Sequence, residues 1–255
     1  MRVDDIYDRE DVPPKARGSV HRTILEWFSG RQPGLVLDAP TGIGHLAKKL
    51  MAKGFTVVGG EIEPEIIRVP GLKVIHTDLN ERIDAASESF DYICCVDGLE
   101  HMTNPYRAVE EFARVLKPLG YGIFSLPNYS NIEKRIKFFW NGFLTKPVSD
   151  AHFRREGGNL FNLHNSPLTI TLLEFIFRVN GLKIIEIKRN AIKPRQYLLL
   201  PLVLLMKAAA ACANDRQRMK YRYDLTLNSK VVLGGNNLIL ITQKTSPAEQ
   251  RMGVC

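Results

Sequence analysis

An acidic residue and two glycines follow the first apolar segment of the chain. Asp38 comes directly after the run at 35–37, and Gly42 and Gly44 come shortly after it. Glycine lets the backbone turn tightly and approach a ligand without a Cβ clash. A helix that begins at such a turn offers free N–H groups to the same ligand. The pattern indicates a ligand site, although many tight turns contain glycine for conformational reasons alone.

Glu61 has the spacing of a ribose-binding acid. It falls 17 residues after Gly44, close to the separation at which an acidic residue binds ribose hydroxyls in nucleotide-binding folds. A carboxylate accepts hydrogen bonds from two neighbouring hydroxyls at once, which suits a cis-diol. The alternative is a surface glutamate at the end of a strand. We predict that Glu61 binds a nucleoside.

Further acids follow two later apolar segments. Asp78 follows the run at 74–77, and a burst of polar residues at 97–101 follows the run at 92–96. Acids placed repeatedly at strand ends fit a cofactor that has an amine, a diol and an adenine edge. Asp91 lies before the predicted strand, and we expect it to have a capping or structural role.

Short apolar strands alternate with helical stretches around these residues. Strands are predicted at 35–37, 56–59, 73–76, 92–96, 122–126, 182–187 and 237–243. Helices are predicted at 19–29, 45–53, 104–116 and 167–180. Apolar strands separated by helices form parallel βαβ units with both sheet faces covered. Ligands bind beyond the carboxyl ends of such strands, so the acids and glycines are expected to converge there.

Length and composition fit a single globular domain. The chain has 255 residues, of which 45% are hydrophobic and 24% are charged. The predicted core comprises 19–126 and 167–244. Residues 127–166 are rich in aromatic, asparagine and basic residues and are predicted to form a lid. Residues 189–236 are predicted to form a second insertion before the last strand.

The run from Gly34 to Asn128 resembles the small-molecule branch of the class I S-adenosylmethionine-dependent methyltransferases, a group that includes the ubiquinone-biosynthesis enzymes. The acid–glycine turn, the acids after the second and third strands, and the segments FDYICCVDGLEHMTNP and RVLKPLGYGIFSLPN occur in that family's order. The resemblance implies a Rossmann-like, doubly wound α/β fold. Its seven-stranded sheet would be mostly parallel, with an antiparallel last strand. The implied cofactor is S-adenosyl-L-methionine.

The resemblance also implies, by position, which residues bind the cofactor. Glu61 would bind the ribose hydroxyls, Asp78 the adenine amine and Leu79 the adenine face. Pro40 stands where the family usually has the first glycine of its turn. Because proline fixes φ at about −65° and donates no N–H, we expect the turn to be extended there or to lose one backbone contact. The implied set is Asp38, Ala39, Gly42, Gly44, Glu61, Ile62, Asp78, Leu79, Asp97 and Gly98.

The acceptor is expected to bind beside His101. This residue is a candidate general base, because an imidazole pKa of about 6.5 suits proton transfer at neutral pH. Alternatively, it packs against or caps the next helix. In related enzymes the lid covers the acceptor, which makes its histidines candidate contacts or ordinary surface residues. No metal-ligand spacing is present, so we predict no metal site. The candidate substrate residues are Tyr129, His152, Phe153, Arg154 and His164.

Positive charge concentrates in the second half of the chain. Residues 1–130 carry 15 Lys+Arg and 19 Asp+Glu, whereas residues 131–255 carry 20 and 8. A basic half of this kind suits an anionic partner, although a solvated basic surface without a specific partner is equally compatible.

The second insertion contains an apolar run at 197–213 with a single charge, Lys207. The run is shorter than the roughly 20 residues that span a bilayer, and Pro201 interrupts it. Residues 188–222 carry nine Lys+Arg and one acid around it. Apolar surface beside a basic rim is typical of peripheral membrane proteins, so we expect membrane contact through 196–222. The alternatives are a helix buried against the domain and a homodimer interface.

The four cysteines form no CxxC pair, and the first ten residues lack the apolar core of a signal peptide. We therefore expect a reducing compartment without a disulfide framework. The expected location is cytoplasmic, either free or attached peripherally to the inner face of the membrane.

The predicted reaction is attack by an acceptor oxygen, rather than nitrogen or carbon, on the cofactor's methyl group. The basic, apolar insertion favours a glycan, a lipid-linked sugar or a similar hydrophobic metabolite as acceptor. One alternative is an NAD-dependent oxidoreductase. GxGxxG is absent, and although Ala47 is a tolerated variant at the third glycine position, the turn lacks the spacing from the first strand and no hydride-handling residues stand out, so this alternative is disfavoured. The other is a non-catalytic or RNA-binding methyltransferase-like module. No aromatic RNA-binding signature is present, so no nucleic-acid partner is expected.

Overall fold

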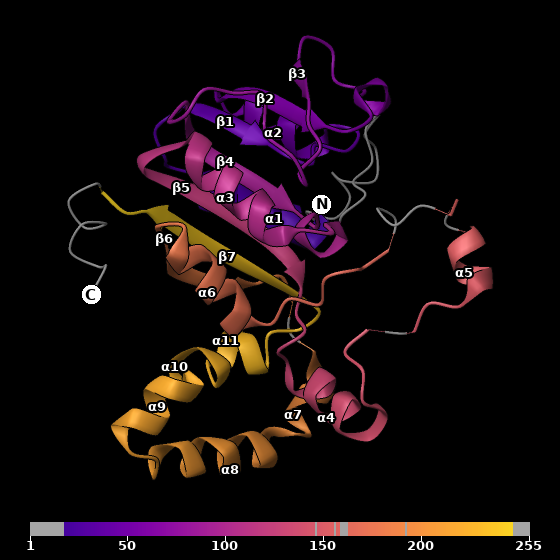
Figure 1. Ribbon diagram of the computed structural model, residues 1–255. Helices are drawn as coiled ribbons and strands as arrows, with labels where there is room; N and C mark the ends of the chain where they lie inside the picture. Colours follow the sequence, from indigo (N-terminus) through magenta and orange to yellow (C-terminus); the bar gives the residue numbers. More distant parts are fainter. Residues whose placement is uncertain (1–17, 146, 156, 159–162, 192, 247–255) are drawn as a thin grey trace, which may run out of the picture.

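A seven-stranded sheet forms the centre of the protein, in the order β3-β2-β1-β4-β5-β7-β6 (Figure 1). The computed structural model describes residues 18–145, 147–155, 157–158, 163–191 and 193–246. Strand β7 runs antiparallel to both of its neighbours, and the other pairs are parallel. The predicted α/β sheet with an antiparallel last strand is therefore confirmed. The strands are β1 (Leu35–Asp38), β2 (Thr56–Glu61), β3 (Lys73–His76), β4 (Phe90–Val96), β5 (Leu116–Pro127), β6 (Leu182–Arg189) and β7 (Asn237–Lys244).

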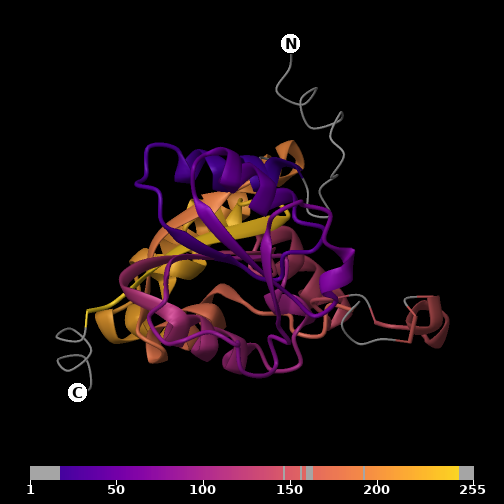
Figure 2. The same ribbon diagram turned by 90° about the horizontal axis from the view of Figure 1, so that it is seen from above.

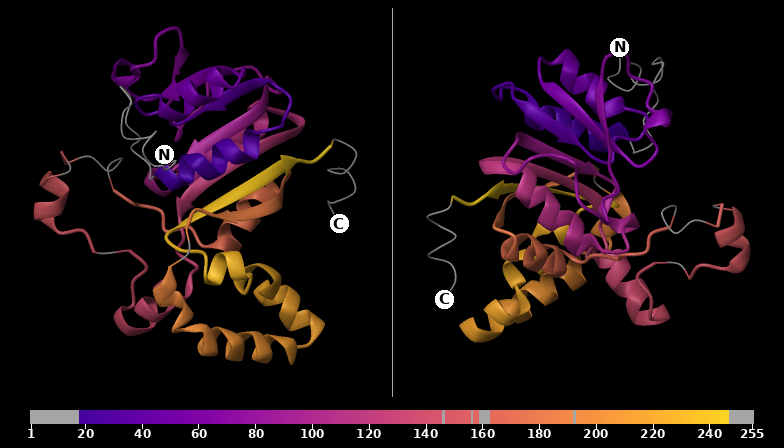
Figure 3. Two further views of the ribbon diagram at one scale, coloured as in Figure 1. Left: turned by 180° about the vertical axis from the view of Figure 1, so that it is seen from behind. Right: turned by 45° about the horizontal axis from the view of Figure 1, so that its top comes forward.

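Helices cover both faces of the sheet, as the doubly apolar strands predict. One core cluster joins α1 (Gly18–Phe28) and α2 (His45–Ala52) to one face. The other joins α3 (Pro105–Val115) and α6 (Ile170–Val179) to the opposite face. In Figure 1, α3 and α6 lie in front of the sheet. The left view of Figure 3 shows the molecule from behind, and there α1 lies in front of the sheet. The strand order reverses between β1 and β4, which is where ligands bind in open parallel sheets.

Asp91 is the second residue of β4 and does not precede the strand as predicted. Its Oδ2 accepts a hydrogen bond from the Leu35 N–H at 2.8 Å, and its Oδ1 lies 2.7 Å from Nζ of Lys117. These bonds keep the pKa of Asp91 below its usual value, although its burial opposes them. Asp91 thus links β4 to both neighbouring strands, which agrees with the structural role expected for it.

The two insertions contain short helices. The lid has α4 (Ile132–Asn141) and α5 (Asp150–Arg155), and α5 stands away from the sheet (Figure 2). The second insertion has α7 (Pro194–Tyr197), α8 (Leu200–Ala211), α9 (Asp215–Tyr221), α10 (Tyr223–Thr226) and α11 (Ser229–Val232). A small core of Ile132, Val203 and Val232 joins α4, α8 and α11. The division into one domain with two insertions stays a prediction.

Candidate active site

A cavity of about 970 Å³ opens beyond the carboxyl ends of β1, β2 and β4. Its volume is at the upper end of the range for small-molecule sites. Of the residues predicted to act in catalysis or binding, those that line it are Asp38, Gly42, Glu61, Asp97, His101, Tyr129, His152 and His164. The predicted convergence of the strand-end acids therefore holds for three of the four, and residues of the lid, α1, α2 and the start of β7 add to the walls.

The glycine turn after β1 adopts backbone conformations that suit glycine. Gly42 and Gly44 have φ of 56° and 95°. A Cβ on Gly44 would lie 2.4 Å from Cγ2 of Val69, so a larger residue does not fit there. Oε2 of Glu61 accepts a hydrogen bond from the Gly42 N–H at 2.6 Å, and Oε1 accepts one from the Ile62 N–H at 3.0 Å. The predicted ribose-binding acid is thus held against the glycine turn, because β1 and β2 are parallel neighbours.

Asp38 is almost completely buried at the end of β1. Its Oδ2 has no hydrogen-bond partner among the described residues. Burial and, second, the charge of Glu61 raise its pKa well above the usual value, and a hydrogen bond from the Ala47 backbone opposes them. A buried carboxyl beside a second acid is stabilised by a cation or a hydrogen-bond donor. The pair therefore suits a ligand that carries positive charge and hydroxyl groups.

Pro40 is accommodated by the glycine opposite it. The Ala39–Pro40 peptide bond is cis. The next residue keeps the turn closed, since the Thr41 N–H donates to the Gly60 carbonyl at 3.0 Å. A Cβ on Gly98 would lie 2.5 Å from Cδ of Pro40 and 3.0 Å from Sγ of Cys95. Gly98 therefore makes room for the proline ring, which the sequence did not indicate.

This contact makes Gly98→Ala a test of the packing around the turn. Gly98 has a φ of −121°, so alanine brings no backbone strain and the effect is steric. We expect the free energy of unfolding to fall by about 1–3 kcal/mol, as for other overpacked sites. Urea denaturation measures it. Gly18→Ala is the control, because a Cβ there meets no atom within 4 Å. Equal stability of the two variants would contradict the predicted clash.

Some predicted cofactor residues do not line the cavity. Leu79 is buried in the hydrophobic core beside α3. Oδ1 of Asp78 accepts hydrogen bonds from the backbone and side chain of Asn80 at 2.8 and 3.0 Å. This turn directs Leu79 into the core and away from the cavity. The adenine-binding roles of Asp78 and Leu79 stay predictions. The other predicted cofactor residues outside the lining, Ala39, Gly44, Ile62 and Gly98, are sequence neighbours of lining residues.

His101 belongs to a group of side chains at the lid end of the cavity. It ends the short helix η3 (Leu99–His101), and its Nδ1 lies 3.1 Å from the Leu163 carbonyl oxygen. The rings of His101 and His164 meet edge to face, with centroids 4.8 Å apart. Nδ1 of His164 lies 3.1 Å from the hydroxyl of Tyr129. Two lid residues predicted to contact substrate are thus assembled around the predicted base.

Glu100 lies beside this group and is 1% exposed. Burial and the neighbouring Asp97 raise its pKa to about 8. Burial and then Glu100 raise the pKa of Tyr129. Burial, His101 and Lys134 lower the pKa of His164, which favours its neutral form. The sequence had placed Glu100 near the site without giving it a role.

Of the three substrate residues predicted in α5, one lines the cavity and two do not. His152 lines it, and Nδ1 of His152 lies 2.9 Å from a guanidinium nitrogen of Arg155. Phe153 and Arg154 do not line it, and Arg154 is exposed. Their predicted contacts with substrate stay predictions.

Sequence reasoning missed a pair of histidines on the other wall. The rings of His21 and His45 stack with centroids 4.9 Å apart and an interplanar angle of 17°. Burial, followed by the charge of His45, lowers the pKa of His21 to about 3, so this ring is neutral at physiological pH. His45 directly follows Gly44, which was a usable signal. His21 lies on α1, and the sequence did not show that the packing of this helix would bring the ring to the cavity.

The chain matches the family model described as a methyltransferase domain over residues 9–187. The chain belongs to this family. Together with the fold, the match makes it a class I S-adenosylmethionine-dependent methyltransferase, and it argues against the oxidoreductase alternative.

The chain spans about half the length of the curated relatives that it matches. The chain is 33% identical over 117 residues to a ubiquinone biosynthesis O-methyltransferase of Paracidovorax citrulli, covering 41% of this chain and 49% of that protein. It is 34% identical over 113 residues to the enzyme of the same name from Hahella chejuensis, covering 41% and 45%.

Solved methyltransferase structures share the fold over most of the chain. A SAM-dependent methyltransferase from Archaeoglobus fulgidus aligns with a TM-score of 0.55 and 14% identity, covering 95% of this chain and 100% of that one. The 1,6-didemethyltoxoflavin-N1-methyltransferase of Burkholderia thailandensis, solved with 1,6-didemethyltoxoflavin and S-adenosylhomocysteine, aligns with a TM-score of 0.52 and 15% identity, covering 95% and 82%. At these identities the likeness concerns the fold alone.

The cavity of this methyltransferase fits S-adenosylmethionine, which supplies an electrophilic methyl group when bound. The buried Oδ2 of Asp38 lacks a partner among the described residues, and the carboxylate of Glu61 lies at the turn where a ribose would sit. The glycine turn leaves the backbone open to a ligand. Asp97 faces the same cavity, with Oδ1 held by Oγ of Ser125 at 2.9 Å.

Proposed function

We propose that this methyltransferase transfers a methyl group to a hydroxyl oxygen of an amphipathic acceptor. The observation that carries the proposal is the fixed orientation of His101 in the cavity wall. A carbonyl oxygen only accepts hydrogen bonds, so Nδ1 of His101 must carry the proton that it donates to Leu163. In the neutral ring, Nε2 then has a lone pair to act on an acceptor hydroxyl.

The chain's residues divide the work between the two ends of the cavity. Asp38, Glu61 and the glycine turn hold the cofactor at one end. The group around His101 orients and activates the hydroxyl at the other. When the acceptor oxygen forms its bond to the methyl carbon, Nε2 of His101 would take up the hydroxyl proton, and the cofactor held by Asp38 and Glu61 would leave as the neutral thioether, which keeps the electrons of the broken S–C bond. Holding the oxygen in line with the methyl carbon supplies much of the acceleration.

Two further observations support a hydroxyl on a hydrophobic acceptor. The curated relatives are named as O-methyltransferases of ubiquinone biosynthesis. The chain also exposes apolar side chains and basic residues in its second insertion. Such a surface would allow the protein to reach an acceptor that is embedded in a membrane. Candidate acceptors are a glycan, a lipid-linked sugar or a hydrophobic metabolite.

The exposed apolar surface combines α4 with α7 and α8. Phe139 and Trp140 of α4 are 80% and 75% exposed, and Leu198 and Leu205 are 81% and 66% exposed. The two sets belong to one unit, because α4 and α8 share a small core, and they lie at the same end of the molecule (Figures 1 and 3). Only Val203 and Ala210 of α8 are buried, so burial of this helix against the domain does not explain its leucines.

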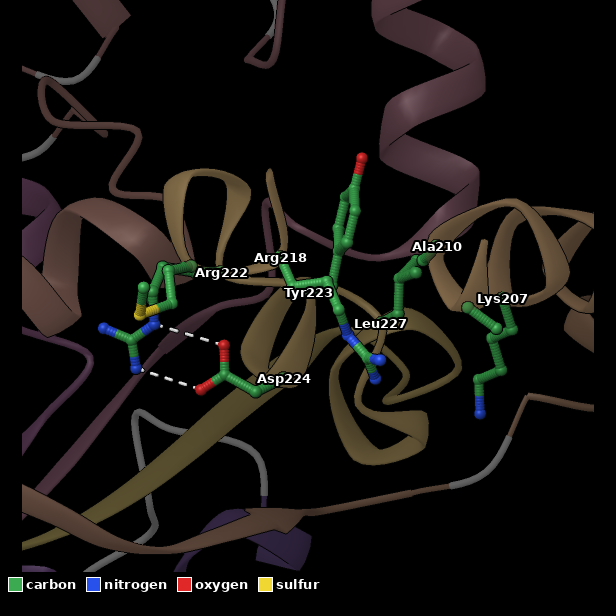
Figure 4. A pocket seen from close by; sticks show the side chains of 9 residues that line it. Lys207, Ala210, Arg218, Arg222, Tyr223, Asp224 and Leu227 are labelled. Atoms are coloured by element: carbon green, nitrogen blue, oxygen red, sulfur yellow. Dashed lines mark hydrogen bonds and ion pairs between the residues drawn. The ribbon is translucent and has the colours of Figure 1, made fainter. Parts of the chain in front are cut away.

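Basic residues lie in the same insertion as the exposed leucines of α8. A second cavity, of about 460 Å³, lies among α8, α9 and α10. Figure 4 shows the Arg222 guanidinium paired with Asp224, whereas Lys207 and Arg218 extend on the other side of the pocket. Among the described residues, no helix has both the length and the apolar character needed to cross a bilayer. We propose peripheral contact with an anionic phospholipid surface, since the charges and the exposed side chains complement it.

Vesicle binding tests this contact. The double variant Phe139→Ser with Trp140→Ser should bind phosphatidylglycerol-containing vesicles about tenfold or more weakly, because two large apolar side chains no longer enter the lipid. Co-sedimentation measures it. Leu119→Asn is the control, since this exposed leucine lies at the start of β5. Equal binding of the double variant and the wild type would contradict the proposed membrane face. If the apolar surface is instead a homodimer interface, the double variant would have a lower molecular mass in solution than the wild type.

A labelled-methyl assay tests the reaction itself. The protein is offered lipid-linked glycans, sugar nucleotides and quinone precursors together with S-adenosyl[methyl-14C]methionine. We expect labelled product from an amphipathic acceptor, with the methyl group on oxygen by mass spectrometry and NMR. A product methylated on nitrogen or carbon would contradict the proposed O-methylation.

A further inference from the structure

Glu100, His101 and His164 form a cluster at the lid end of the cavity, which we call the Glu–His–His cluster. Each contributes one potential ligand atom, and all three atoms lie within 4.8 Å of one another. The sequence predicted no metal site, because His101 and His164 are far apart along the chain. Two imidazoles and one carboxylate are the ligand set of many mononuclear catalytic metal sites.

The two chain segments that carry the cluster are tied together by their backbones. The Ser166 N–H donates to the Glu100 carbonyl at 3.0 Å, and the Ser166 hydroxyl donates to the Met102 carbonyl at 2.8 Å. Nδ2 of Asn165 lies 3.3 Å from the His101 carbonyl. These bonds hold residues 165 and 166 against the backbone of 100–102, which keeps the chain segments of the cluster side by side.

Glu100 has no other evident purpose in the cavity. Its side chain is buried, and Oε2 has no hydrogen-bond partner among the described residues. The predicted cofactor contacts include Asp38, Glu61 and Asp97 and do not include Glu100. A buried carboxyl oxygen without a donor is costly, and a bound cation would stabilise its charged form.

Both histidines have an oxygen beside Nδ1. His101 donates from Nδ1 to the Leu163 carbonyl, and Nδ1 of His164 lies beside the Tyr129 hydroxyl. Metal-binding histidines commonly donate their second N–H to such an oxygen, which fixes the ring and its tautomer. A metal would then be bound through Nε2 of each ring.

We propose that the Glu–His–His cluster binds one divalent first-row transition-metal ion, such as Zn²⁺, which activates the acceptor hydroxyl. The proposal deepens the proposed function and rests on it. Bonds of about 2.1 Å place tetrahedral ligand atoms about 3.4 Å apart, so modest side-chain rotations close the site. Three protein ligands leave a position open for the acceptor oxygen.

The metal ion lowers the pKa of the coordinated hydroxyl, whose proton passes to solvent buffer. The metal-bound oxygen then attacks the methyl carbon, the C–O bond forms, and the S–C electron pair returns to sulfur. The ion then takes over the activation of the hydroxyl from Nε2 of His101, so the proposal keeps the proposed O-methylation and replaces the base role given to His101 above.

Direct metal binding tests the proposal without requiring an acceptor. The full chain is dialysed against EDTA and titrated with CoCl₂, because Co²⁺ bound to imidazole shows visible d–d absorption. We expect about one Co²⁺ per chain, displaced by Zn²⁺. Glu100→Gln and His164→Asn should each weaken binding by about tenfold or more. His76→Asn is the control, because His76 is exposed at the end of β3. Wild-type binding no tighter than that of either cluster variant would overturn the proposal.

Two additional measurements separate this proposal from the proposed function. Calorimetry with S-adenosylhomocysteine should give similar dissociation constants for the wild type and both cluster variants, which shows that they remain folded and keep the cofactor site. Once an acceptor is found, EDTA treatment should lower the methyl-transfer rate and Zn²⁺ should restore it. Full activity after EDTA treatment would overturn the catalytic role of the metal ion while leaving methyl transfer intact.

Discussion

Replacing His101 by alanine is expected to lower the rate of methyl transfer by about 100-fold or more while leaving cofactor binding intact. The side chain lies in the cavity wall, with Nδ1 against the Leu163 carbonyl and its ring against that of His164. Alanine removes the group that activates the acceptor, whether it acts as a base or as a metal ligand. The cofactor is expected to bind elsewhere, against Glu61 and the glycine turn, which are joined by the hydrogen bond from the Gly42 N–H. Loss of rate without loss of affinity is the signature of an interaction made with the reacting group.

The measurement combines single-turnover kinetics with calorimetry. The dissociation constant for S-adenosylhomocysteine should stay within about threefold of the wild-type value. His76→Ala serves as the matched control, because it removes an exposed imidazole from the end of β3. A rate loss of less than about threefold for His101→Ala would reject any chemical role and favour the packing alternative.

The sequence indicated that Asp38, Gly42 and Glu61 lie together at the predicted cofactor end of the cavity, because their convergence depends on local and regular features. Asp38 and Glu61 each end a strand, and β1 and β2 pair in parallel with Asp38 opposite Gly59. Parallel pairing places the carboxyl ends of both strands at one edge. The contact between Glu61 and the Gly42 N–H follows from that arrangement.

The same reasoning says less about the segment after β3, where the adenine-binding roles of Asp78 and Leu79 stay predictions. The family position assigns Leu79 to the adenine face, but the Asp78–Asn80 turn directs this side chain into the core. The direction of a side chain beyond a strand end depends on the turn that follows, and here that turn is held by Asn80. Oδ1 of Asn80 in turn accepts a hydrogen bond from the Thr103 N–H, so the turn depends on a contact 23 residues away.

The acceptor end could not be assembled from sequence at all. His101 and the Leu163 carbonyl that holds it are 62 residues apart, and Tyr129 and His164 are 35 apart. No periodic pattern links such positions, because the lid returns to η3 through irregular backbone. The sequence could name these residues one by one, whereas their convergence and the burial of Glu100 depend on tertiary structure.

Replacing Glu61 by alanine is expected to weaken S-adenosylhomocysteine binding by about 1–3 kcal/mol, which corresponds to roughly 5- to 150-fold in the dissociation constant. A charged acceptor of ribose hydroxyls contributes more than a neutral one, and the buried surroundings of Glu61 strengthen the effect. Isothermal titration calorimetry measures the change. Glu63→Ala is the matched control, since Glu63 is an exposed acid two residues further along the chain.

The alanine variant also removes the partner of the Gly42 N–H, so Glu61→Gln separates the two contributions. Glutamine keeps an oxygen that can accept from the Gly42 N–H, but it loses the charge and turns an NH2 group, which cannot accept, towards the Ile62 N–H. If ribose binding is the main role, glutamine should lose a large part of the affinity that alanine loses, because charge-assisted bonds are about twice as strong as neutral ones. Wild-type affinity in Glu61→Gln combined with weak binding in Glu61→Ala would instead show that Glu61 acts by shaping the glycine turn. Wild-type affinity in both variants would remove Glu61 from the site.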